Sequence, residues 1–179
     1  MRAKEEKNKV YEYFRVEETF FTGKHRTYVD SLWTQNKIME SYIERLIDLY
    51  MVAVAIGLKA KRKAEEDRSD EQKRTIQTKQ LNDNIETLMQ LMRMVIILDD
   101  STGKTVEERV EEAFRIPDNY EDYKKNIDLF NSYARGGIEI LYEELIAAPL
   151  TDKDIDYGDG KISKIISFVS NFVDNVNTI

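Results

Sequence analysis

Apolar residues recur about every three to four positions along most of the chain, which is the period of an amphipathic helix. The pattern is clearest over 32–56, where we expect the longest helix. Its last third, Met51 to Ile56, is apolar on every side and predicts a place at the centre of a bundle, where Gly57 would let another helix approach closely. The apolar positions that define this helix are Leu32, Met39, Ile43, Leu46, Tyr50 and Val54.

Similar spacing predicts helices over 81–98, 106–114, 120–145 and 162–176. Thr105 and Glu108 form a T-x-x-E capping box at the start of the short helix over 106–114. The apolar positions of this helix are Val106, Val110, Ala113 and Phe114. Pro117 ends that helix because proline disfavours helical backbone at the residue before it. The Gly136-Gly137 pair interrupts the 120–145 pattern and indicates a junction or kink. The segment 10–21 alternates loosely, and we expect a short helix there rather than a strand.

These patterns predict an all-α fold, a single-domain bundle of about five to seven helices over residues 1–179. The composition agrees, because 34% of the residues are charged and only seven are glycine and two proline, which is too little turn chemistry for an all-β fold. We expect an exposed linker at about 64–74 and an acidic loop at about 149–160.

The chain contains no cysteine, which excludes disulfides, thiolate zinc sites and cysteine nucleophiles and favours a cytoplasmic location. Residues 1–9 are charged and do not resemble a signal peptide. The longest uncharged apolar run, Leu49 to Leu58, has ten residues. A transmembrane helix needs about 18 to 20, so we expect no membrane contact.

Charge divides the chain. Residues 99–159 hold 7 Lys+Arg and 17 Asp+Glu, a net charge of −10, which should repel phosphate backbones. Contact with DNA would therefore involve the first half, where a basic cluster follows the apolar helix: Lys59, Lys61, Arg62 and Lys63. Acidic residues interleave with the cations just beyond this cluster, so a solvated helix end is the favoured interpretation and a DNA-binding site the alternative.

The chain matches known catalytic and ligand-binding motifs only incompletely. Thr102-Gly-Lys-Thr105 resembles the end of a phosphate-binding loop, but Leu98 stands where that loop needs its first glycine, so we expect an ordinary turn. His25 is the only histidine, and we expect a surface or capping role for it. The acidic loop departs from an EF-hand, although an irregular metal site remains an alternative there: Asp152, Asp154, Asp156 and Asp159.

Two segments resemble a known group of proteins. Leu49 to Lys63 resembles the apolar helix, glycine and basic tail of small accessory proteins encoded beside DNA-phosphorothioation (Dnd-type) antiphage genes. Phe130 to Leu145 is similar to their closing helix with its aromatic, alanine and paired glycines. The resemblance covers about residues 10–148 and implies a bacterial defence-associated protein, without implying any catalytic residue.

We therefore expect a non-enzymatic accessory or interaction protein of a prokaryotic DNA-modification or phage-defence system. It would act through helix-mediated contact with a protein partner or with a second copy of itself, and no cofactor is expected. Two alternatives stay open. One is a DNA-binding module that uses the basic cluster; the other is a carboxylate-based, metal-dependent nuclease that uses Asp99, Asp100 or the acidic loop.

Overall fold

The structure is a computed structural model that describes residues 11–15, 17–34, 41–149 and 160–174. This part of the chain is mainly helical, which confirms the predicted fold class. In chain order its elements are β1 (Thr19–Phe21), α1 (Gly23–Leu32), α2 (Leu46–Lys59), β2 (Arg74–Ile76), α3 (Thr78–Asp83), α4 (Ile85–Leu98), α5 (Val106–Phe114), α6 (Tyr120–Tyr142), the π-helical turn η3 (Glu143–Ala147) and α8 (Gly160–Asp174).

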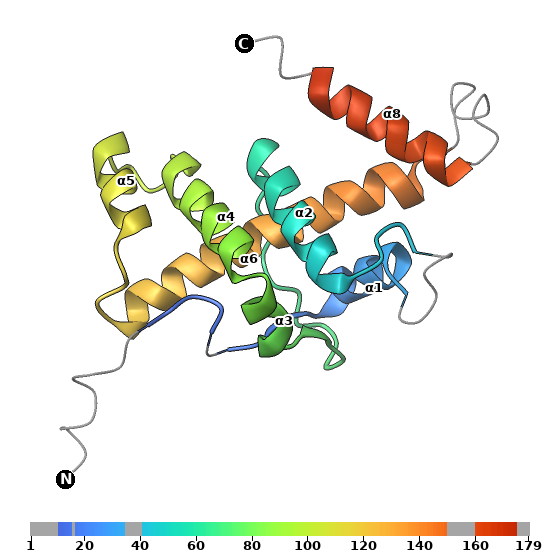
Figure 1. The fold of residues 1–179 in the computed structure, drawn as a ribbon. Helices are drawn as coiled ribbons and strands as arrows, with labels where there is room; N and C mark the ends of the chain where they lie inside the picture. Colours follow the sequence, from blue (N-terminus) through green and yellow to red (C-terminus); the bar gives the residue numbers. More distant parts are fainter. Residues whose placement is uncertain (1–10, 16, 35–40, 150–159, 175–179) are drawn as a thin grey trace.

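Helix α6 is the longest helix in the described ranges and runs through most of the length of the molecule (Figure 1). It packs mainly against α2, and α1 and α4 add contacts along its length. The core lies between these helices and is filled by large side chains, among them Tyr50, Phe130, Met92 and Ile138. None of the described helices is both long and apolar enough to span a membrane.

Glycines set the distance between α2 and α6. A Cβ atom on Gly57 would overlap the carbonyl oxygen of Tyr133, and a Cβ atom on Gly137 would overlap that of Ala53. The predicted close approach at Gly57 is therefore confirmed. The predicted junction at the Gly136-Gly137 pair is wrong, since α6 continues through both residues. Gly137 lies at the crossing with α2, and Gly136 lies against the Arg62 carbonyl in the turn after α2.

The predicted helix over 32–56 is also wrong in its first half. Helix α1 ends at Leu32, Trp33 is extended, and α2 begins only at Leu46. Two hydrogen bonds join the end of α1 to the residues just before α2. The Tyr42 amide donates to the Leu32 carbonyl at 2.8 Å, and the Trp33 indole donates to the Glu44 carbonyl at 3.0 Å.

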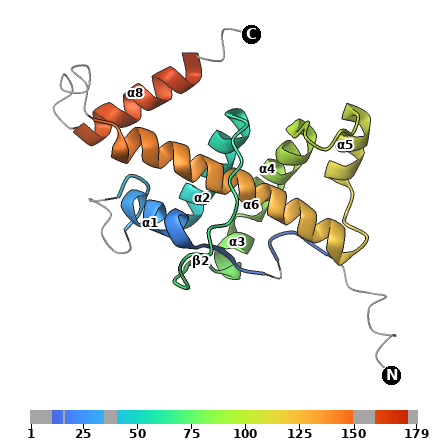
Figure 2. The same cartoon turned by 180° about the vertical axis from the view of Figure 1, so that it is seen from behind.

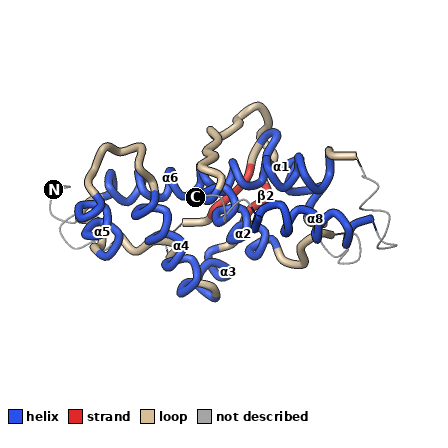
Figure 3. The backbone as a smooth tube through the Cα atoms, turned by 90° about the horizontal axis from the view of Figure 1, so that it is seen from above, coloured by secondary structure: helices blue, strands red, loops and turns tan. Residues whose placement is uncertain are grey.

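The segment before α1 is not the expected short helix. Thr19–Phe21 forms strand β1, which pairs antiparallel with β2 so that Phe20 faces Thr75. The two short strands lie beside α1 (Figure 3). Thr19 and Phe21 are buried and Phe20 between them is exposed, which is the two-residue alternation of a half-buried strand.

The polar segment predicted as a linker crosses the outer side of α6 (Figure 2). The Ala64 amide donates to the Ser132 carbonyl at 3.0 Å, and the Arg135 Nε donates to the Ala64 carbonyl at 2.8 Å. Farther along, the carboxylate of Asp67 accepts a hydrogen bond of 2.7 Å from the Lys24 amide in the first turn of α1. A residue of the linker therefore caps a helix that lies far from it in the sequence.

Candidate functional site

The basic cluster predicted from the sequence lies at the end of α2 and in the turn after it. Its first two cations have partners from distant parts of the chain. The Lys59 ammonium contacts the Phe172 carbonyl oxygen and lies 4.0 Å from the centre of the Phe172 ring in α8. Lys61 pairs with Asp100 at 3.0 Å.

Lys63 reaches a buried carboxylate. Its Nζ atom lies 3.0 Å from Asp99, which is 1% exposed, and 2.8 Å from the Ser101 hydroxyl. Tyr133 on α6 donates to the same carboxylate at 3.2 Å. Burial by itself raises the pKa of Asp99, but the hydrogen bonds from Ser101 and Lys63 together outweigh it and hold that pKa below its usual value.

Arg62 joins the largest charged network, which is centred on Glu139 of α6. Its guanidinium binds Glu139 at 2.8 Å and Glu143 at 2.6 Å. Lys24 and His25 of α1 contact the Oε1 atom of Glu139 at 2.8 and 3.1 Å. Burial by itself raises the pKa of Glu139. The hydrogen bonds from Lys24, Arg62 and His25 together outweigh it and hold that pKa below its usual value. The network ties α1 and the turn after α2 to α6.

The expectation of a surface or capping role for His25 is wrong, because the ring is 0% exposed. Burial lowers the pKa of His25 against the opposing effect of the hydrogen bond to Glu139. Its second ring nitrogen, Nδ1, has no hydrogen-bond partner in the described part of the chain. His25 is a core residue whose neutral form the fold favours.

The four cations of the basic cluster are thus bound to acceptors within the chain. A phosphate backbone would have to compete with these contacts, since each cation already has an oxygen partner.

The proposed metal ligands Asp152, Asp154, Asp156 and Asp159 lie outside the described residues. In the part of the chain that the structure describes, no three side chains of His, Cys, Asp or Glu are grouped so as to hold a metal ion. Thr102-Gly-Lys-Thr105 is the turn between α4 and α5, as expected. Thr105 and Glu108 form the predicted capping box there.

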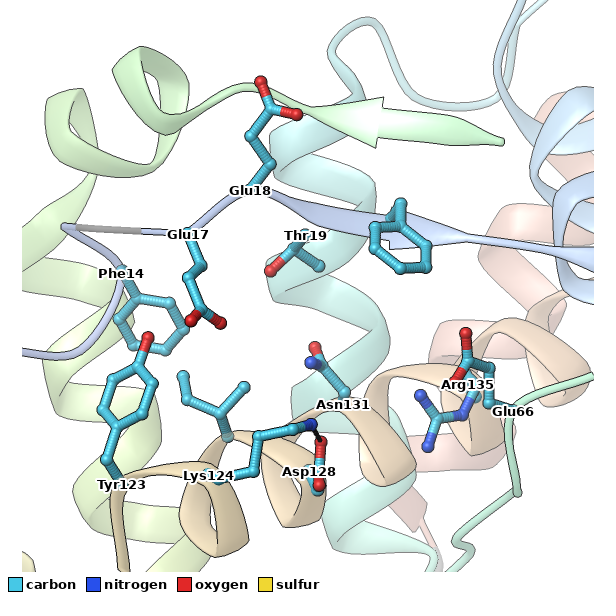
Figure 4. A pocket seen from close by; sticks show the side chains of 12 residues that line it. Phe14, Glu17, Glu18, Thr19, Glu66, Tyr123, Lys124, Asp128, Asn131 and Arg135 are labelled. Carbon is cyan, nitrogen blue, oxygen red and sulfur yellow. Dashed lines mark hydrogen bonds and ion pairs between the residues drawn. The ribbon is translucent and has the colours of Figure 1, made fainter. Parts of the chain in front are cut away.

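A hollow of about 110 Å³ lies between the segment before β1, the linker and one face of α6 (Figure 4). Arg135 enters it from α6, and burial lowers the pKa of its guanidinium. Lys124 is paired with Asp128 at 2.5 Å. Because carboxylates also come from Glu17, Glu18 and Glu66, the walls carry both signs of charge and favour neither an anion nor a cation.

An exposed apolar surface lies at the end of the molecule formed by α4 and α5. Helix α5 has extensive contact only with α4 among the described elements, and it buries one residue, Ala113. The expected apolar positions Val106, Val110 and Phe114 are 55%, 40% and 66% exposed. We call these three residues the α5 stripe. They are spaced four residues apart and therefore lie on one face of the helix.

Further apolar side chains are exposed on the elements next to the α5 stripe: Met94 and Leu98 on α4, Ile116 after α5, and Tyr120 at the start of α6. Exposed carboxylates flank the stripe, because Glu107 and Glu111 follow Val106 and Val110 by one position. The periodicity of 106–114 identifies an amphipathic helix. It does not reveal that the apolar side lacks a cover, which depends on the position of α5 at the end of the bundle.

Helix α8 at the other end of the molecule also exposes apolar residues: Ile162, Ile165, Ile166 and Val169. Its inner side packs Phe168 and Phe172 against the core.

Comparison of the chain with known proteins found no matching family model, no matching curated protein and no matching solved structure.

Proposed function

We propose that this chain is a non-enzymatic protein-interaction module that binds a basic, amphipathic helix of a partner protein along the α5 stripe. The observation that carries the proposal is the exposure of three apolar side chains on one face of a helix whose extensive contacts, within the described elements, are with α4 alone. Isolated apolar residues on a surface are common, but a continuous helical row of them is typical of helix-in-groove recognition.

The energetic gain from covering the stripe is substantial. Complete burial of a valine or phenylalanine side chain contributes about 1.5–3 kcal/mol, and these three side chains are about half exposed. Covering them would contribute about 1 kcal/mol each, before the cost of association.

Charge favours a basic partner over a second copy of the chain. The stripe is flanked by Glu107 and Glu111, and α5 as a whole carries four glutamates and one arginine, a net charge of −3. Two copies meeting at this surface would bring like charges together, whereas lysine or arginine beside the apolar face of a partner helix would meet carboxylates. The resemblance to accessory proteins of Dnd-type loci supports a bacterial DNA-modification or phage-defence system as the setting of this interaction.

Fluorescence anisotropy tests the proposal directly. The probe is a labelled synthetic helix of about 16 residues with leucines on one face and flanking lysines. We expect saturable binding to the full chain, weakened at least about tenfold by Val110→Asp, a change of about 1.4 kcal/mol.

The matched control is Ile165→Asp on α8, because Ile165 and Val110 are 37% and 40% exposed. This control should bind the peptide as the unaltered chain does. Equal binding by Val110→Asp would contradict the proposal. A homodimer in light scattering that Val110→Asp dissociates would assign the stripe to a second copy instead.

A further inference from the structure

A second, chemically different hollow lies beside the α5 stripe. It has a volume of about 210 Å³ and is formed by the segment 11–15, one side of α4 between Ile85 and Arg93, and the residues from Ala113 to Pro117. Its walls are largely apolar, with Ile85 and Met89 of α4 facing Phe114 and Ile116. Three arginines also line it: Arg15, Arg93 and Arg115.

The three arginines differ in their partners. Arg15 pairs with Glu12 at 2.7 Å, and Arg115 lies 3.8 Å from Asp118. The guanidinium of Arg93 lies 4.9 Å from the centre of the Phe114 ring, and its Nε atom is buried without a hydrogen-bond partner among the described residues. Arg93 is therefore the one of the three whose guanidinium has no carboxylate partner within the described part of the chain, so its charge is available to an anion in the hollow.

We infer that this hollow, the Arg93 site, binds a small monocarboxylate with an apolar ring or a short branched chain. Arg15 and Arg115 are balanced by Glu12 and Asp118, so Arg93 leaves one positive charge in excess, which favours a monoanion. The apolar walls favour a ligand with an apolar body. The size is sufficient, because a cavity of about 150 Å³ holds benzene, and the remaining space admits a carboxylate.

In the bound state the carboxylate of the ligand would accept hydrogen bonds from the Arg93 guanidinium, the planar donor best suited to a carboxylate. The ring would lie against Met89 and Ile116. Binding at the Arg93 site does not depend on the proposed peptide interaction. The two sites prefer opposite charges, although Phe114 borders both.

Isothermal titration calorimetry with phenylacetate tests the inference. Phenylacetamide has the same shape without the charge, and acetate has the charge without the ring. We expect phenylacetate to bind at least tenfold more tightly than either. Equal affinity for phenylacetate and phenylacetamide, or no detectable binding of phenylacetate at millimolar concentration, would overturn the inference.

Arg109 provides a matched control variant. Its Nε atom is also buried without a partner, and it lies on α5 but does not line the hollow. Arg93→Gln should weaken phenylacetate binding at least tenfold, while Arg109→Gln should leave it within twofold of the unaltered chain. An equal loss in both variants would overturn the assignment to Arg93.

The peptide experiment separates the two proposals. Val110→Asp should weaken peptide binding at least tenfold and retain phenylacetate binding, whereas Arg93→Gln should weaken phenylacetate binding at least tenfold and retain peptide binding. Circular dichroism of each variant shows whether its helices are intact. If Arg93→Gln lowers helical content, Arg93→Lys, which keeps the charge and loses the planar fork, should still bind phenylacetate more weakly than the unaltered chain. Unchanged affinity in a folded Arg93→Lys variant would overturn the guanidinium's role.

Discussion

His25 and Glu139 show how single residues link distant segments of this chain. The buried ring contacts the Glu139 carboxylate at 3.1 Å across 114 positions of sequence. Lys24 and Arg62 contact the same carboxylate, so α1 and the turn after α2 converge on one side chain of α6. A carboxylate with this many donors remains ionised in the folded protein, and its loss would leave several buried or half-buried donors unpaired.

The buried histidine predicts a specific dependence of stability on pH. Because burial lowers the pKa of His25 in the folded state, the unfolded chain binds more protons than the folded chain just below the ordinary histidine pKa of about 6.5. The free energy of unfolding should therefore fall as the pH is lowered from about 7.5 to 5.5. Urea unfolding at both values measures it.

His25→Gln supplies the control, since His25 is the only histidine in the chain. The variant should lose about 1–3 kcal/mol at the higher pH through its altered packing, and its stability should change less between the two pH values. Equal pH dependence in the variant and the unaltered chain would show that His25 does not titrate on unfolding.

At the scale of elements, the crossing of α2 and α6 depends on glycine. Gly137→Ala should lower the free energy of unfolding by about 1–3 kcal/mol or more, because its Cβ atom would overlap the Ala53 carbonyl oxygen. Lys125→Ala changes an exposed position of the same helix and should stay within about 0.5 kcal/mol. Chemical denaturation of both variants measures the difference. If the two variants had similar free energies of unfolding, the packing of α2 against α6 would not depend on glycine at position 137.

Elements with local signals could be predicted from the sequence. Helix α5 begins at the capping box of Thr105 and Glu108 and ends at Phe114, before Pro117, as expected. The boundary between α1 and α2 could not be predicted, because apolar spacing continues across it. That boundary depends on hydrogen bonds between Trp33 and Glu44 and between Leu32 and Tyr42, which periodicity does not reveal.

The candidate site was only partly predictable for a related reason. The sequence identifies the apolar positions of α5 and the acidic charge around them, both of which are local properties. Whether Val106, Val110 and Phe114 are covered depends on which helices pack against α5. The basic cluster shows the opposite case, because its charges are visible in the sequence while partners such as Asp99 and Glu139 come from distant helices.

At the scale of the whole molecule, the charged networks and the apolar surfaces occupy different places. Arg62, Glu139 and their partners join α1, α2 and α6 near the centre, where they stabilise the fold. Two groups of exposed apolar residues lie on α5 and α8, at opposite ends of the molecule (Figure 1). Because the α5 stripe lies away from these networks, a partner could cover it without breaking the contacts that stabilise the fold.

The most direct test of this account is to reverse the charges beside the α5 stripe and those on the peptide that binds it. The unaltered chain and the Glu107→Lys/Glu111→Lys double variant are each titrated with the lysine-flanked peptide and with a glutamate-flanked peptide that has the same leucine face. We predict that at low salt the unaltered chain prefers the lysine peptide by at least about tenfold, and that the double variant reverses this preference. If both proteins bind both peptides with the same affinity, the α5 stripe is not a docking surface for a basic helix.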